Sequence, residues 1–126
     1  MRKLTLPTQF LAQLLAIAAL ILSISSALAH TGLESSSPNN GAIVNQAPDQ
    51  LSLTFSGDVT LVRLSVTDQQ DRQLNTDFSP AREPQAAYQV SLPALVVGRF
   101  TVQWTAIGED GHTLTDTFSF VVDPTA

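Results

Sequence analysis

The chain has 126 residues, with no cysteine and with Met1 as its one methionine, and eleven acidic against six basic residues give a net charge of −5. The lack of cysteine excludes disulfides, thiolate zinc sites and iron–sulfur clusters, so any metal site must use nitrogen and oxygen ligands. An acidic chain is also a poor partner for nucleic acid, and we expect no such partner.

The N-terminal segment has the order of a secretory signal peptide. Arg2 and Lys3 precede an apolar stretch over residues 10–24, and small residues follow up to Ala29. The apolar stretch is shorter than the about 20 residues that a membrane-spanning helix needs. We therefore expect residues 1–29 to be a cleaved signal peptide and the protein to be exported from the cytoplasm. The alternative is an uncleaved membrane anchor.

Cleavage after Ala29 leaves residues 30–126, which are enough for one compact domain with one core. Because Arg2 and Lys3 leave with the signal peptide, the net charge falls to −7. We expect this domain to be a monomer.

Alternating apolar and polar residues in the domain predict β-strands, because successive side chains of a strand point to opposite faces. Such runs cover residues 51–55, 62–66, 88–92, 100–106 and 114–122. In the second run Val62 is expected to face the core. Residues 74–87 include Pro80 and Pro84 and are expected to form an irregular strand and a mobile loop. The pattern predicts an all-β antiparallel sandwich with Trp104 in its core.

His30, one of only two histidines, is the first residue of the predicted mature chain. An N-terminal histidine offers its α-amine and its imidazole Nδ1 together, and these two nitrogens can close a chelate ring around one metal ion. No internal histidine can do this. His30 is therefore a candidate metal ligand.

The second histidine, His112, follows Asp110 and Gly111 in a loop. In an extended segment this spacing places the carboxylate and the imidazole on one side, and the glycine lets the backbone bend so that they converge. With His30 these residues form a set of nitrogen and oxygen donors that suits copper(II), and protons compete for the donors at low pH. The alternative is an ordinary turn beside a surface histidine.

Several segments resemble, in order and spacing, the CopC family of periplasmic copper-resistance proteins. The segments are 30–33 (HTGL), 37–42 (SPNNGA), 47–48 (AP), 51–56 (LSLTFS), 98–104 (GRFTVQW), 109–112 (EDGH) and 118–121 (FSFV). The resemblance covers essentially all of the domain.

The resemblance implies a seven-stranded antiparallel Greek-key β-sandwich, Ig-like and cupredoxin-like, with one copper(II) ion held by His30, Asp110 and His112. It implies a carrier without enzymatic activity that buffers copper or delivers it to a CopD-like membrane importer. Some family members have a glutamate after the Phe-Ser pair, where this chain has Gly57 followed by Asp58. A fourth carboxylate ligand therefore stays open. Some members also have a methionine-rich copper(I) loop, and this chain has no methionine after Met1.

The residues leave three other functions open. A metal-free Ig-like adhesion or assembly module would give neither histidine a role. A copper oxidase would use the paired amine and imidazole as a histidine brace, although the chain has no evident planar aromatic surface for a substrate. A zinc protein would use the same histidine and aspartate ligands in a tetrahedral site.

Overall fold

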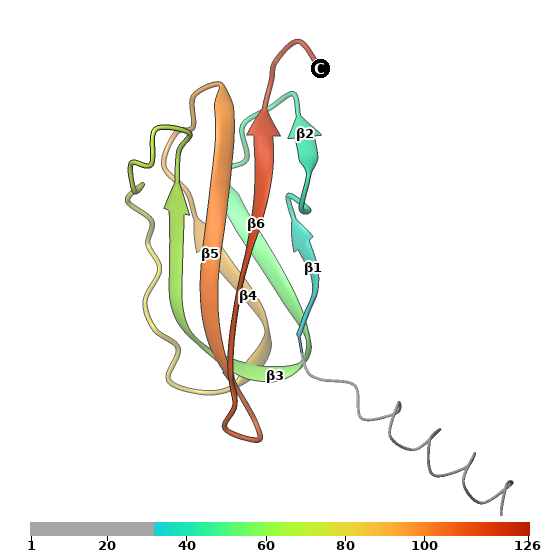
Figure 1. The fold of residues 1–126 in the computed structure, drawn as a ribbon, viewed down its shortest axis with the longest axis vertical. Coiled ribbons are helices and arrows are strands. Elements are labelled where there is room, and N and C mark those ends of the chain that lie inside the picture. The colour runs from blue at the N-terminus through green and yellow to red at the C-terminus, as the bar shows by residue number, and fades with distance from the viewer. Residues whose placement is uncertain (1–31) are drawn as a thin grey trace, which may run out of the picture. The chain divides into compact units, whose positions relative to one another are not determined.

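The computed structural model describes residues 32–126, in which six strands form one curled sheet (Figure 1). The strands are β1 (Leu33–Ser37), β2 (Ala42–Val44), β3 (Gln50–Thr67), β4 (Gln85–Ser91), β5 (Gly98–Gly108) and β6 (Thr113–Val122). The predicted all-β class is confirmed. Seven strands were expected, and the described part of the chain has six. The predicted signal peptide and His30 lie outside the described residues.

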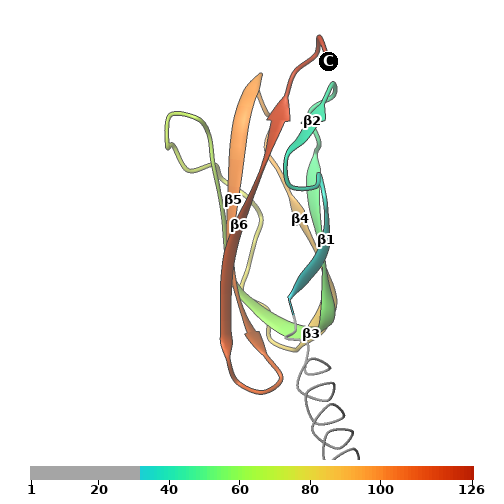
Figure 2. The ribbon, with the colours of Figure 1, turned by 45° about the vertical axis from the view of Figure 1, so that its right-hand side comes forward.

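The long strand β3 connects the two layers of the fold. The strand order is β1-β3-β5-β6-β2, with β4 paired to β3, and all pairs except β2 with β6 are antiparallel. The first part of β3 pairs with β1 as far as Phe55 and with β4 as far as Thr54, and the part from Val59 onward pairs with β5. Residues 55–58 lie at the bend between these parts, and Figure 2 shows β3 bending at the lower end of the fold.

Two predicted runs, 51–55 and 62–66, belong to this single strand. The register of β3 against β5 shifts between Leu61 and Arg63, as in a β-bulge. The shift changes the phase of the alternation, so Leu61 and Leu64 are both buried and Val62 is only half-buried. The prediction that Val62 faces the core is therefore wrong.

The core consists of side chains from the inner faces of both layers. Its members are Leu51, Leu53, Phe55, Val59, Leu61, Leu64, Val66, Tyr88, Val90, Phe100, Val102, Trp104, Ala106, Phe118, Phe120 and Val122. Trp104 is 3% exposed, which confirms its predicted core position, and its ring lies edge-on to Phe55 with centroids 5.1 Å apart. No charged side chain among residues 32–126 is buried.

Residues 74–84 form no strand, and β4 begins at Gln85. Pro80 and Pro84 have no N–H group to donate to a neighbouring strand. Leu74 and Ala81 pack against the core, and their backbone N–H groups donate to carbonyl groups of β3. The irregular strand that the sequence predicted here is therefore an extended segment covering the core. Within the described chain no helix has the length and hydropathy to cross a membrane.

Candidate metal centre

The loop between β5 and β6 lies at the lower end of the fold and contains Asp110 and His112 (Figure 1). The N–H group of Gly108 donates to the His112 carbonyl at 2.9 Å, and the N–H group of Gly111 donates to the Gly108 carbonyl at 2.9 Å. Gly111 has a φ of 83°, in the left-handed region where a glycine avoids a steric penalty. These bonds close a tight hairpin whose tip presents both predicted ligands.

The side chains of Asp110 and His112 contact each other, as their spacing predicted. Oδ1 of Asp110 accepts the backbone N–H of His112 at 3.0 Å, and Oδ2 lies 2.7 Å from Nδ1 of the imidazole. The contact arises from the turn, in which an aspartate accepts a hydrogen bond from the backbone two residues later. The two side chains are 65% and 82% exposed, so the pair is open to solvent.

The contact changes the proton affinity of both groups. The hydrogen bond from His112 lowers the pKa of the Asp110 carboxyl below its ordinary value. The same bond, together with the negative charge of Asp110, raises the pKa of the His112 imidazole above its ordinary value. Protons therefore compete with a metal ion for His112 at a higher pH than they do for an isolated histidine.

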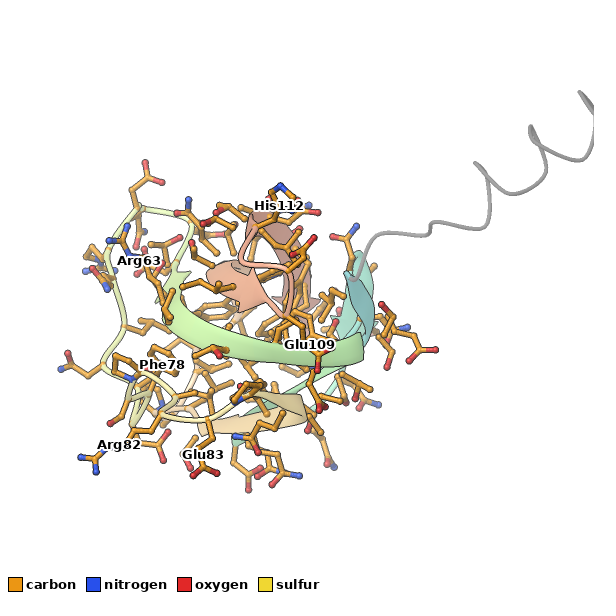
Figure 3. All side chains as sticks on the ribbon, turned by 90° about the horizontal axis from the view of Figure 1, so that it is seen from below. Arg63, Phe78, Arg82, Glu83, Glu109 and His112 are labelled. Carbon is orange, nitrogen blue, oxygen red and sulfur yellow. The ribbon has the colours of Figure 1, made fainter. Side chains whose placement is uncertain are left out.

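The contact also determines which imidazole nitrogen is available. In the neutral ring a proton on Nδ1 is donated to Asp110, and Nε2 keeps a free lone pair. Figure 3, which views the fold from below, shows His112 at the rim. The two ring nitrogens face different directions, so a metal ion at Nε2 lies away from Oδ2 of Asp110. Coordination of one ion by both side chains therefore requires the ring to leave its hydrogen bond with Asp110.

Gly108 is a residue that the sequence analysis did not single out. A Cβ atom at this position would lie 3.1 Å from Oδ1 of Asp110, which is tighter than ordinary van der Waals contact. The glycine therefore leaves room for the Asp110 carboxylate to fold back over the end of β5. A glycine three residues before another glycine is the only signal of this in the sequence.

The first described residues also lie at this end of the fold. The N–H group of Gly32 donates to Oγ of Ser56 at 3.1 Å, and the N–H group of Ser56 donates to the Gly32 carbonyl at 2.9 Å. Three residues after Ser56, Val59 pairs with Gly108 at the base of the hairpin. The bend of β3 therefore connects the beginning of the domain to the Asp110–His112 hairpin, and Figures 1 and 2 both show the start of β1 and the hairpin at the lower end.

Other carboxylates do not join the pair. Asp58 is exposed and lies within β3. Asp116 is opposite Trp104 in the β5–β6 ladder, and its Oδ1 accepts the N–H group of Thr117. Across the described range no three histidine or acidic side chains form a group that could hold a metal ion. Of the three predicted ligands, the structure brings two together, and His30 lies outside it.

These features define a class: a small all-β domain with an exposed histidine–aspartate pair at the end where its first strand begins. A CopC domain is matched over residues 33–123, so the chain belongs to the CopC family. Membership of this family confirms the resemblance and the prediction that the chain is not an enzyme.

Individual relatives agree with this assignment. The chain is 27% identical over 107 residues to copper resistance protein C of Escherichia coli, covering 77% of this chain and 84% of that protein. The crystal structure of CopC from Methylosinus trichosporium OB3b matches with a TM-score of 0.64 at 25% identity, over 77% of this chain and 97% of that one. PcoC, a methionine-rich copper resistance protein from Escherichia coli, matches with a TM-score of 0.58 at 25% identity, over 75% of this chain and 100% of that one.

Proposed function

We propose that this protein is exported, begins at His30 after removal of residues 1–29, and binds one copper(II) ion per chain at the lower end of the fold. The ligands are the α-amine and Nδ1 of His30, Nε2 of His112 and the carboxylate of Asp110. The observation that carries the proposal is the bend of β3, which joins Gly32 through Ser56 to the base of the Asp110–His112 hairpin.

The length of the chain is compatible with this ligand set. His30 is two residues before Gly32, and two residues span at most about 7 Å. The three residues from Ser56 to Val59 advance a strand by about 10 Å. Gly32 and the base of the Asp110–His112 hairpin are therefore both bonded to one short stretch of β3, residues 56–59.

The donor types favour copper(II). Two imidazoles, an amine and a carboxylate suit a tetragonal copper(II) ion, which is also bound most strongly in the divalent series. Copper(I) prefers thioether and thiolate donors, and the chain has no cysteine and no methionine after Met1. This chain therefore differs from its relative PcoC, which is described as methionine-rich.

The exposure of the pair supports a carrier. Asp110 and His112 are 65% and 82% exposed, so copper can enter and leave without unfolding of the domain. We propose that the protein buffers copper(II) in the periplasm as a monomer and can pass it to a CopD-like membrane importer. The copper resistance named for its relatives is the role that such buffering serves.

The decisive experiment compares protein that begins at His30 with protein that carries one extra alanine before it. The added residue removes the α-amine from the chelate ring but leaves Asp110 and His112 intact, so we expect much weaker copper(II) binding in a competition titration with a chelator. Electron paramagnetic resonance should show nitrogen coordination that is reduced in the extended protein. Equal affinity and equal spectra would show that the N-terminal chelate does not exist.

Two controls complete this experiment. Mass spectrometry of the exported protein tests cleavage after Ala29. A titration in which zinc(II) competes with copper(II) tests the metal, and we expect copper to displace zinc because it is bound more strongly by nitrogen and oxygen donors.

A further inference from the structure

Tyr88 in β4 binds the backbone of β3 through its hydroxyl group. The hydroxyl donates to the Val59 carbonyl at 2.5 Å and accepts the N–H group of Leu61 at 3.3 Å. The residue is 9% exposed, and its ring lies edge-on to Phe55 with centroids 6.1 Å apart. Two backbone groups inside the fold therefore have a side chain as their partner.

The bend of β3 explains why a side chain is needed. The pairing of β3 with β4 passes from Thr54 and Ala87 directly to Val59 and Gln85, so residues 55–58 face a single residue of β4. A backbone that leaves a ladder in this way has N–H and C=O groups without strand partners, and burying them unpaired is costly. The Tyr88 hydroxyl satisfies one group of each kind just after the bend.

The same stretch of β3 supports the candidate metal centre. Val59 pairs with Gly108, whose N–H group donates to the His112 carbonyl at 2.9 Å. Within the bend itself, Ser56 binds Gly32 through two hydrogen bonds. A short series of bonds therefore leads from the buried hydroxyl to the hairpin.

We infer that Tyr88 is a positioning residue for the metal site: its hydroxyl holds the bend of β3 and so fixes the position of the hairpin with Asp110 and His112 relative to the start of β1. The inference rests on the proposed function and deepens it. Tyr88 contacts neither Asp110 nor His112 in the hydrogen bonds of the structure, so its effect passes through Val59 and Gly108.

The test substitutes Tyr88→Phe in protein that begins at His30. Phenylalanine keeps the ring against Phe55 and removes only the hydroxyl. The matched control is Val66→Ala, a fully buried residue of the same strand that pairs with Val102, seven residues beyond Val59 and away from the hairpin. Both variants should lower the thermal midpoint, but only Tyr88→Phe removes a hydrogen-bonding group beside the bend.

Two measurements decide the inference. In metal-free protein, amide exchange of Gly108 should be faster in Tyr88→Phe than in Val66→Ala. With copper(II), the Kd of Tyr88→Phe should rise severalfold, less than the about 10- to 100-fold effect of a group bonded directly to a ligand. The Kd of Val66→Ala should stay near that of the wild type.

An unchanged Kd in Tyr88→Phe, or an equal increase in both variants, would overturn the inference. Equal exchange of Gly108 in both variants would overturn it as well. A wild type that binds no copper would instead sink the proposed function, and the exchange comparison would still decide whether Tyr88 positions the hairpin.

Discussion

Asp110 holds His112 by two hydrogen bonds, one to its backbone N–H and one to its ring nitrogen Nδ1. The two residues are separated only by Gly111, and both side chains face solvent. The orientation of the imidazole therefore comes from the local geometry of the turn and not from burial. The pair therefore keeps Nε2 of His112 both oriented and accessible in the metal-free protein.

The first prediction concerns the pKa of His112 in metal-free protein. Asp110→Asn removes the charge and weakens the hydrogen bond to the ring, so the raised pKa of His112 should fall toward its ordinary value of 6.5. A proton NMR titration of the two histidines measures this. An unchanged His112 pKa in Asp110→Asn would show that the carboxylate does not hold the ring in solution.

The pH dependence of stability follows in sign from the same pair. His112 has a folded pKa above its unfolded value, so its contribution is complete below pH 6.5 and disappears as the pH rises through the raised pKa. Asp110 has a lowered pKa, so its contribution is present above its ordinary value of 3.8 and disappears as the pH falls through the lowered one. Urea unfolding of the wild type and of Asp110→Asn at several pH values should show a small difference in the free energy of unfolding. The difference should be largest between pH 3.8 and pH 6.5, where both contributions are present.

The second prediction concerns Gly108→Ala. The new methyl group would lie 3.1 Å from Oδ1 of Asp110, so the carboxylate should move and release the His112 ring. The His112 pKa should fall toward its ordinary value, and protons should then compete with copper(II) for this residue only at a lower pH than in the wild type. In an Asp110→Asn background the same substitution should lower the His112 pKa no further, because the two changes act through one contact. Additive effects in the double variant would contradict this explanation.

Much of the fold could be predicted from the alternation of apolar residues, but not its irregular points. Val62 follows another apolar residue, Leu61, and a periodicity of two cannot show which of them lies beyond a bulge. The parallel strand β2 has only three residues and exists because of its pairing with residues 120–122 of β6, so no local pattern predicts it.

The candidate site likewise has one feature that the sequence predicted and two that it could not predict. The spacing of Asp110 and His112 predicted that their side chains converge, because the separation is local and the turn between them contains a glycine. The anchoring of Gly32 by Ser56 depends on residues 24 positions apart. The space that Gly108 leaves for Asp110 depends on a turn conformation, so neither feature could be predicted from the sequence.

The third prediction is that copper(II) stabilises the folded protein through His112. A ligand that binds only the folded state at 100 times its Kd adds about 2.7 kcal/mol to the free energy of unfolding. The midpoint of thermal unfolding of the wild type should therefore rise when copper(II) is added. It should return to its metal-free value when a chelator removes the copper. His112→Ala should have nearly the wild-type midpoint without metal, because the side chain is exposed, and a much smaller shift with copper. An equal shift in both proteins would place the ion elsewhere.

The fourth prediction concerns a second carboxylate ligand in addition to Asp110. Along β3, Gly57 is partly buried between the exposed residues Ser56 and Asp58, so position 57 faces the same side as the core residues Phe55 and Val59. A carboxylate introduced by Gly57→Glu should lie between the two anchors of the site and strengthen copper(II) binding. Asp58→Ala should have little effect. Both variants are compared with the wild type in the same chelator titration. If Asp58→Ala lowers the copper(II) affinity by more than Gly57→Glu raises it, Asp58 is the ligand instead.

The fifth prediction uses Trp104, the chain's one tryptophan, as a reporter. Trp104 is four residues before Gly108 on β5, a distance of about 13 Å along the strand. Copper(II) has an open d shell and quenches nearby indole fluorescence, whereas zinc(II) has a filled shell and does not.

A titration with copper(II) should therefore quench the Trp104 emission and reach its end point at one ion per chain, and a titration with zinc(II) should leave the intensity nearly unchanged. His112→Ala should remove the sharp end point, because the remaining donors bind copper weakly. The emission maximum should stay at the wavelength of a buried indole throughout, since the ring is 3% exposed and is not itself a ligand. Quenching that continues linearly past one equivalent, with the same slope in His112→Ala, would indicate collisional contact with free copper and would contradict a single site at this end of the fold.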